Sequence, residues 1–240
     1  MTYVQGFLTP VPLARRDDYI RHATGAVPLF ADHGATRLVE AWGDDVPTGK
    51  LNDFHGAVQR GDDEAALFSW IEYPDRATYD AANAGLMSDP RMAEMGELPF
   101  DGKRMMFGGF APFLDEGSGR GRYIDGFVLP VAKAKRDAYA ALAAKASVVF
   151  RDHGVLRYVE AWGDDVPAGT ITDFYRAAHA EDGDVIVFSW CEWADKAARD
   201  AGMAAIMADD RMHTAPEDMP FDGKRMIYGG FAVIVDEAGA

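Results

Sequence analysis

The chain has 240 residues, a single cysteine and a formal net charge of −15 at pH 7. An acidic surface repels phosphate backbones and anionic lipid, so the composition argues against binding to nucleic acid or to a membrane surface. Cys191 alone excludes an intrachain disulfide framework, and no stretch approaches the roughly 18 apolar residues of a transmembrane helix. The N-terminus has no basic, apolar leader, and we therefore expect a cytoplasmic protein.

An internal repeat at a spacing of about 120 residues organises the chain. LVEAWGDDVP at Leu38–Pro47 returns as YVEAWGDDVP at Tyr158–Pro167. DGKRM followed by GGF occurs at Asp101–Phe110 and again at Asp222–Phe231. Copies of this length are whole small domains rather than solenoid units. We predict one domain at residues 1–116, a second at 123–240 and, between them, a linker whose Gly- and Arg-rich composition is typical of a flexible segment.

The first copy starts with a β-rich strand, predicted at Tyr3–Thr9 and ended by Pro10 and Pro12. A helix is predicted from about residue 13 to residue 33, because apolar side chains recur there at helical spacing. Gly34 is expected to end this helix as its C′ glycine.

The rest of the copy alternates between strands and helices. The predicted elements are a strand at Thr36–Gly43, a short helix or an extra strand at Asn52–Gln59, a strand at Ala66–Tyr73, a helix near 75–88 with a further turn through Met95, and a strand at Met105–Leu114. The second copy repeats this order. Each copy therefore reads β-α-β-β-α-β, the ferredoxin-like arrangement.

The last strand is apolar on both of its faces, with Phe107 on one and Met106 and Phe110 on the other. A sheet with water on one side would alternate more cleanly. We expect helices to cover one face and the sheet of the other copy to cover the second. The predicted fold class is α+β, with two tandem ferredoxin-like domains that form a pseudo-dimeric α+β barrel within one monomeric chain.

Blocks spread over each copy carry a family resemblance. VEAWGDDVP, FSWIEY, MSDPRM and PFDGKRM-x-x-GGF resemble the YbaA-like family, the domain of unknown function numbered 1428, within the dimeric α+β barrel superfamily. The resemblance implies the fold and the pseudo-dimer but no activity. Relatives by fold include cofactor-free monooxygenases, haem-dependent enzymes and small aromatic-compound isomerases, so fold alone does not give function.

Carboxylates beside tryptophans are the best candidates for chemistry. Glu40 and Trp42 share one face of a strand, as do Trp70 and Glu72, and we expect both pairs to converge on one wall. The second copy repeats the set as Glu160, Trp162, Trp190 and Glu192. A glutamate beside an indole in a closed space would have a raised pKa and act as a general base near neutral pH. Alternatively, these glutamates pair with Arg37, Lys103 or Arg104, or reach the strand ends.

The DGKR loops place Arg104 and Arg225 beside a glycine turn, where they would bind an anionic group of a substrate. In the alternative, each is a structural turn whose arginine pairs with Asp44 or Asp45 across the halves. The histidines lack metal-ligand spacing, so no metal site is predicted.

Two functions from different classes remain open. The favoured one is a cofactor-free enzyme with a glutamate base in a Trp-lined pocket for a small organic ligand. The alternative is a non-catalytic binding or assembly protein without an active site.

Overall fold

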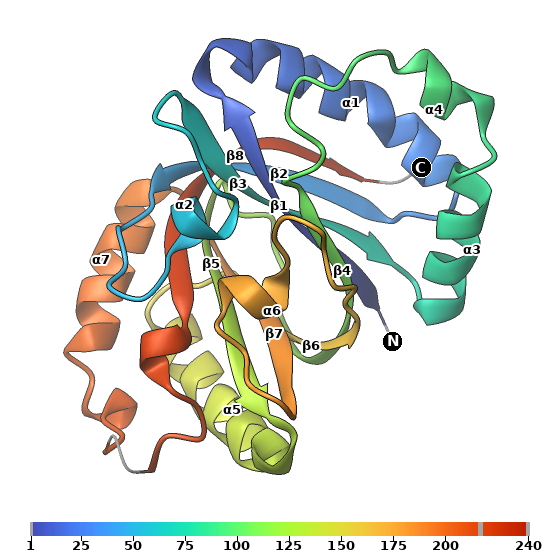
Figure 1. Ribbon diagram of the computed structural model, residues 1–240. Helices are drawn as coiled ribbons and strands as arrows, with labels where there is room; N and C mark the ends of the chain where they lie inside the picture. The colour runs from blue at the N-terminus through green and yellow to red at the C-terminus, as the bar shows by residue number, and fades with distance from the viewer. Residues whose placement is uncertain (1, 216–217, 239–240) are drawn as a thin grey trace.

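The computed structural model describes residues 2–215 and 218–238. Antiparallel strands in this part of the chain close into a barrel in the order β1-β3-β2-β8-β5-β7-β6-β4 (Figure 1). The strands are β1 (Tyr3–Pro12), β2 (Arg37–Asp45), β3 (Glu64–Tyr73), β4 (Met106–Gly117), β5 (Tyr123–Ala132), β6 (Arg157–Asp165), β7 (Asp184–Trp193) and β8 (Ile227–Ala238).

Helices α1, α3 and α4 lie outside the barrel on one side, and α5 and α7 lie outside it on the other (Figure 1). The α-helices are α1 (Arg16–Asp32), α2 (Phe54–Ala57), α3 (Arg76–Leu86), α4 (Pro90–Glu94), α5 (Arg136–Asp152), α6 (Phe174–Ala177) and α7 (Lys196–Met207). Short 3-10 helices are η1 (Leu13–Arg15), η2 (Lys133–Lys135), η3 (Asp210–Met212) and η5 (Gly223–Arg225). Gly34, at φ +92°, follows α1 as predicted. No helix among the described residues is long and apolar enough to cross a membrane.

Each half contributes four neighbouring strands, and pairings between the halves close the barrel. The first half has the order β4-β1-β3-β2 and the second has β8-β5-β7-β6. β2 pairs with β8 and β4 pairs with β6, both antiparallel. The prediction that the sheet of the other half covers the second face is confirmed, because one buried cluster inside the barrel takes side chains from both halves.

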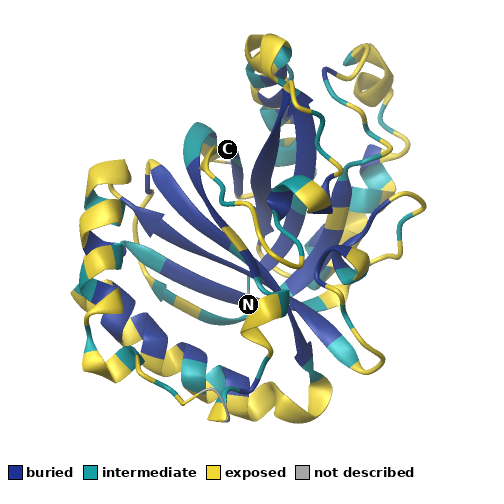
Figure 2. Cartoon of the chain, turned by 60° about the vertical axis from the view of Figure 1, so that its left-hand side comes forward, coloured by how far each residue is buried: buried dark blue, intermediate teal, exposed yellow. Residues whose placement is uncertain are grey.

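Aromatic side chains fill the barrel. Phe68 and Phe188 stack with centroids 4.3 Å apart, and the rings of Trp70 and Trp190 lie 4.5 Å apart. A Cβ atom at Gly126 would stand 2.7 Å from the ring of Phe68, so glycine is required for the ring to lie over the backbone. The strands are mostly buried (Figure 2). The barrel interior is therefore a packed core.

The structure corrects the predicted end of the first strand and decides between the two alternatives for the excursion after β2. The predicted strand end at Thr9 is wrong, because β1 runs through Pro10 and ends at Pro12. β4 pairs only with Val4–Leu8, which leaves both prolines on a stretch of β1 with one unpaired side. The excursion after β2 contains the short helix α2, whose N-cap Asp53 accepts a hydrogen bond from the Gly56 amide at 2.7 Å.

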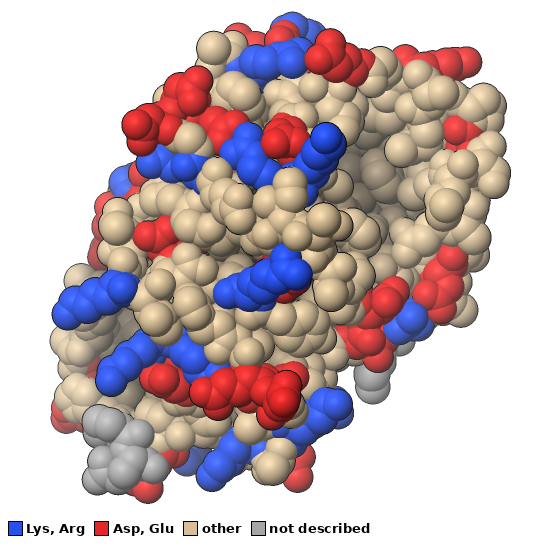
Figure 3. Space-filling model, in the orientation of Figure 1, with Lys and Arg blue, Asp and Glu red and all other residues tan. Residues whose placement is uncertain are grey.

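The surface carries both signs of charge despite the acidic balance. Figure 3 shows Asp and Glu side chains interspersed with Lys and Arg over the face drawn. Pairs such as Arg91 with Asp32, at 2.6 Å, account for part of this pattern.

Candidate functional site

The two Glu–Trp pairs of each half lie on opposite faces of the sheet. Glu40 stands opposite Ser69 across the β2–β3 ladder, whereas Trp70 stands opposite Val39. Since paired residues share a face and neighbours alternate, Glu40 and Trp42 face the helices while Trp70 and Glu72 face the barrel interior. The second half has the same register. The prediction that both pairs converge on one wall is wrong.

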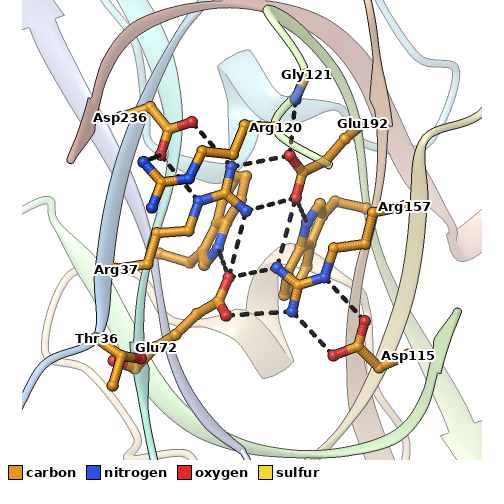
Figure 4. Close-up of polar contacts among 11 residues, drawn as sticks. Thr36, Arg37, Glu72, Asp115, Arg120, Gly121, Arg157, Glu192 and Asp236 are labelled. Atoms are coloured by element: carbon orange, nitrogen blue, oxygen red, sulfur yellow. Dashed lines mark hydrogen bonds and ion pairs between the residues drawn. The ribbon is translucent and has the colours of Figure 1, made fainter. Parts of the chain in front are cut away.

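The interior glutamates are held by arginines of the opposite half (Figure 4). Arg37 donates to both oxygens of Glu192 at 2.8 and 2.9 Å, and Arg157 donates to both oxygens of Glu72 at 2.6 and 3.1 Å. The sequence-based alternative of pairing with Arg37 therefore holds for Glu192, and for Glu72 at 3.6 Å. Arg37 also binds Asp236, which extends the network.

The interior tryptophans complete this network. Trp70 Nε1 donates to Glu72 at 3.0 Å, and the guanidinium of Arg37 lies over the Trp70 ring at 5.6 Å. Trp190 and Glu192 repeat the arrangement at 3.3 Å. These carboxylates are buried, neutralised and surrounded by packed rings, which is the environment of a structural ion-pair cluster.

A cavity of about 620 Å³ lies on the helix face of the second half. It is lined by α5, by side chains of β5, β6 and β7, and by residues of the segments 211–215 and 218–226. Most of its walls are apolar or aromatic, including Phe127, Phe150, Met212 and Phe221. A largely apolar cavity of this size with a few polar groups is typical of a small-molecule site.

Glu160 is the buried carboxyl group on the wall of this cavity, with 4% of its surface exposed. Tyr158 donates to its Oε1 at 2.7 Å and Tyr139 donates to its Oε2 at 2.9 Å. Burial raises the pKa of Glu160 to about 7, and the tyrosine hydroxyl groups oppose that rise. A carboxyl group with this pKa can accept or release a proton at neutral pH.

Charged and polar side chains lie among the residues that line the cavity: Lys145, Arg211, His213 and Asp218. Arg211 is engaged by Asp209 and Asp152, each at 2.7 Å. Within residues 2–215 and 218–238, no cluster of three His, Cys, Asp or Glu side chains is arranged to hold a metal ion.

The corresponding carboxyl of the first half is Glu40. Tyr19 donates to its Oε2 at 2.6 Å, and the Ser69 hydroxyl donates to the same oxygen. Burial raises the pKa of Glu40 as well. A cavity of about 340 Å³ lies beside α1, but Arg21, His22 and Met95 line it and Glu40 does not.

Neither helix-face tryptophan lines the cavity. Arg136 covers the ring of Trp162 at 5.3 Å, and Arg16 covers Trp42 at 5.5 Å. Trp162 packs against Tyr139 at 6.3 Å, one layer behind the cavity wall. The expectation of a Trp-lined pocket is therefore corrected for this cavity, which tyrosine and phenylalanine line.

The two loop arginines bind carboxylates of their own half. Arg104 contacts both oxygens of Glu64 at 2.7 Å, and Arg225 contacts Asp184 at 2.7 Å. The predicted pairing with Asp44 or Asp45 is wrong, because those aspartates bind residues near the start of α7: Lys196 at 3.2 Å and Arg199 at 2.7 Å. Neither loop arginine lines the cavity.

Sequence reasoning selected Glu160 but missed the tyrosines that hold it. One signal was present: Tyr19 and Tyr139 recur at the same place in the two copies, on the apolar stripe of a helix. Tyr158 gave a different signal, since Leu38 replaces it in the first copy.

Strands closed around an aromatic interior, with helices outside, define an α+β barrel protein. The profile of the family described as "Protein of unknown function (DUF1428)" matches residues 2–102 and 122–223, so the chain belongs to that family. Uncharacterized protein YbaA of Escherichia coli K12 is 53% identical over 117 residues, which are 48% of this chain and all of YbaA. YbaA of Shigella flexneri matches to the same extent. The resemblance to the YbaA-like family is confirmed.

Solved structures support the barrel fold at low sequence identity. An anthrone oxidase-like protein aligns with a TM-score of 0.60 and 14% identity, over 100% of this chain and 93% of that protein. A candidate monooxygenase from Lactobacillus acidophilus NCFM aligns with a TM-score of 0.60 and 11% identity, over 100% of this chain and 97% of that protein. At this identity the similarity concerns the fold.

Proposed function

We propose that the second half of the chain binds a small, largely aromatic organic molecule and that Glu160 is its general base, without a bound cofactor. The observation that carries the proposal is a carboxyl group of pKa about 7 on the wall of an apolar cavity of about 620 Å³. Ligand sites typically have volumes of about 300–1,000 Å³. Of the residues selected from sequence, we assign the base to Glu160 and structural roles to Glu72 and Glu192.

The reaction we assign to Glu160 is proton abstraction from a weakly acidic C–H or O–H group. The proton moves to the carboxylate, and the electron pair of the broken bond stays on the substrate, delocalised over its ring system. Aromatic walls favour such a planar substrate, and the hydroxyl groups of Tyr139 and Tyr158 fix the carboxylate. The name of one structurally similar protein, anthrone oxidase-like protein, agrees with an aromatic substrate of this kind.

Hydrogen–deuterium exchange of anthrone tests this proposal. Its methylene protons lie next to two aromatic rings and opposite a ketone, so a base can remove them, and deuterium returns from D2O. We expect the protein to accelerate this exchange, measured by proton NMR without oxygen near neutral pH. Glu160→Gln should remove about a hundredfold or more of that acceleration. The exposed Glu97→Gln is the control.

An exchange rate equal to that of buffer, or an unchanged rate in Glu160→Gln, would contradict the general base. The competing function is non-catalytic ligand binding. It is favoured by one observation, that both oxygens of Glu160 already accept hydrogen bonds from tyrosine. Saturable binding of anthrone without faster exchange would support that function instead.

We also infer that the barrel arose by duplication of one βαββαβ unit, with residues 1–116 and 123–240 as the two copies. The support is the identical strand order of the halves and the two matches to one family profile. A barrel closed within one chain needs no second copy, so we propose a monomer.

A further inference from the structure

We propose that the ligand site is confined to the second half of the chain, where Tyr158 is the positioning residue that orients Glu160. Glu40, its counterpart, has a structural role in this assignment. The inference rests on the proposed function. It adds which half binds the ligand and which residue positions the base. Three differences between the halves carry it.

The first difference is the way the carboxyl group is held. In the second half, Tyr158 and Tyr139 donate to different oxygens of Glu160, so two points fix the plane of the carboxyl group. In the first half, Tyr19 and Ser69 both donate to Oε2 of Glu40. A carboxyl group held through one oxygen keeps freedom of rotation about its terminal bond, whereas a base must present a lone pair in a fixed direction.

The second difference is the residue two positions before the glutamate on its strand. Tyr158 on β6 packs its ring against Phe150 of α5 with centroids 5.3 Å apart, and both side chains line the cavity. Leu38 of β2 takes the same position in the first half and is buried in the core between sheet and helices. Leucine has no hydroxyl group and cannot hold the second oxygen of the glutamate.

The third difference is the covering segment, the stretch that leads to the last strand of each half and includes Phe100 in the first half and residues 211–215 and 218–226 in the second. In the first half, Phe100 packs against both Tyr19 and His22 of α1, with centroids 5.7 and 6.3 Å apart. In the second half, Phe221 packs against Tyr139 at 5.7 Å, and Leu142, which takes the place of His22, lines the cavity. The covering segment of the second half is also one residue longer.

Tyr139 on α5, Tyr158 on β6 and Ser189 on β7 hydrogen-bond Glu160, and the thiol of Cys191 on β7 lies near it. Lys145 on α5 and Arg211, His213 and Asp218 on the covering segment line the same cavity. Among these, Tyr158 is the one that both touches the carboxyl group and has no hydroxyl-bearing counterpart in the first half. It is therefore the residue to test.

The decisive variant is Tyr158→Phe, which keeps the ring and removes the hydroxyl group. Carboxyl carbon NMR of protein labelled at glutamate Cδ should show the titration of Glu160 move upward by about one pH unit, because a donor to the carboxylate is lost. Anthrone exchange should slow about tenfold. Tyr158→Leu, which copies the first half, should show both effects. A role in packing alone would leave the titration of Tyr158→Phe unchanged, and that result would overturn the assignment.

Binding of 2-naphthol tests the confinement to one half. Fluorescence titration should give one equivalent per chain, lost in Glu160→Gln and retained in Glu40→Gln. Two equivalents, or loss of binding in Glu40→Gln, would overturn the confinement while the general base remains supported by anthrone exchange. No binding of 2-naphthol together with no anthrone exchange would overturn both proposals.

Discussion

Arg37 on β2 and Glu192 on β7 form a buried bidentate ion pair across the barrel, with Nη1–Oε1 at 2.8 Å and Nη2–Oε2 at 2.9 Å. Arg157 and Glu72 form the reciprocal pair. Each half thus supplies the cation for the carboxylate of the other, beside the neighbouring rings of Trp70 and Trp190. A half displaced by one register step would leave these charges buried and unpaired, so we assign the network to specifying how the halves join.

Removal of one partner should be costly. We expect Glu192→Gln to lower the free energy of unfolding by about 3 kcal/mol, because Arg37 loses a buried counter-ion and the Gly121 amide loses its charged acceptor. Chemical denaturation at pH 7 measures this value. The exposed Glu97→Gln should stay within about 0.5 kcal/mol of the original protein.

A double replacement separates the ion pair from simple packing. If the pair mainly specifies geometry, Arg37→Met combined with Glu192→Met should be less destabilising than the sum of the two single changes. Full additivity would show that the two side chains act independently.

The stability of the protein should depend on the ionisation of Glu160. Its pKa in the folded state, about 7, lies above the ordinary value of 4.5, so the folded state holds a proton that the unfolded state releases. The contribution of Glu160 is therefore greatest below about pH 4.5 and is lost as the pH rises through about 7. Each pKa unit corresponds to about 1.4 kcal/mol, so the loss reaches about 3 kcal/mol.

Unfolding free energies of Glu160→Gln and the original protein, measured from pH 4.5 to pH 8, test this dependence. The advantage of the glutamine variant should grow with pH and become constant above about pH 8. A difference that is independent of pH would show that Glu160 has an ordinary pKa, and the general base would lose its physical basis.

Two glycine-to-alanine changes should have opposite signs. At Gly126 the new methyl group meets the ring of Phe68 at 2.7 Å inside a packed core, and we expect a loss of about 1–3 kcal/mol. At Gly25, exposed in the middle of α1 with nothing within 4 Å, alanine should stabilise by about 1 kcal/mol through its higher helix propensity. Thermal unfolding of the two variants measures both effects. A neutral Gly126→Ala would mean that the barrel interior is looser than the stacked rings indicate.

The barrel could be predicted from the sequence because the patterns that indicate it are local and occur in both copies. The copies recur at a fixed spacing, and strands that are apolar on both faces require a second cover. The site was harder to predict, because the register between β2 and β3 decides whether Glu40 and Trp70 lie on the same face of the sheet. Each pair was placed correctly on its own strand, but no local pattern fixes which residue of β2 stands opposite Ser69.

The cavity itself depends on long-range structure. Residues 211–215 and 218–226 line it together with α5, and contacts such as Phe221 with Tyr139 hold these parts of the chain against the helix. The sequence shows the extra residue but does not indicate where the backbone of this stretch lies. The importance of Tyr158 likewise emerges only when β6, β7 and α5 are assembled around Glu160.

The closed barrel leads us to expect a monomer. Every strand of the barrel has two neighbours within the chain, so no whole strand edge is free to pair with a second copy, and prolines lie on the unpaired end of β1. Sedimentation equilibrium should give the mass of one chain, 26.2 kDa, at micromolar concentration. A stable dimer would show that another surface joins two chains and would contradict the proposed monomer.

A polar contact joins His153, at the end of α5, to Asp209, just before η3, and we expect it to hold this part of the cavity wall in place. Their Nε2 and Oδ2 atoms lie 2.9 Å apart, and Asp209 also accepts hydrogen bonds from Arg211. The guanidinium of Arg211 and the ring of His153 hold the pKa of the Asp209 carboxyl group well below its ordinary value, so it stays charged at neutral pH. We expect Asp209→Asn to release η3 and to speed amide hydrogen exchange at residues 210–213 several-fold, with weaker binding of 2-naphthol.

The matched change Asp89→Asn breaks the same contact with His33, at 3.0 Å, in the first half. It should loosen α4 and leave 2-naphthol binding unchanged, and equal effects of the two variants on binding would contradict a cavity confined to the second half.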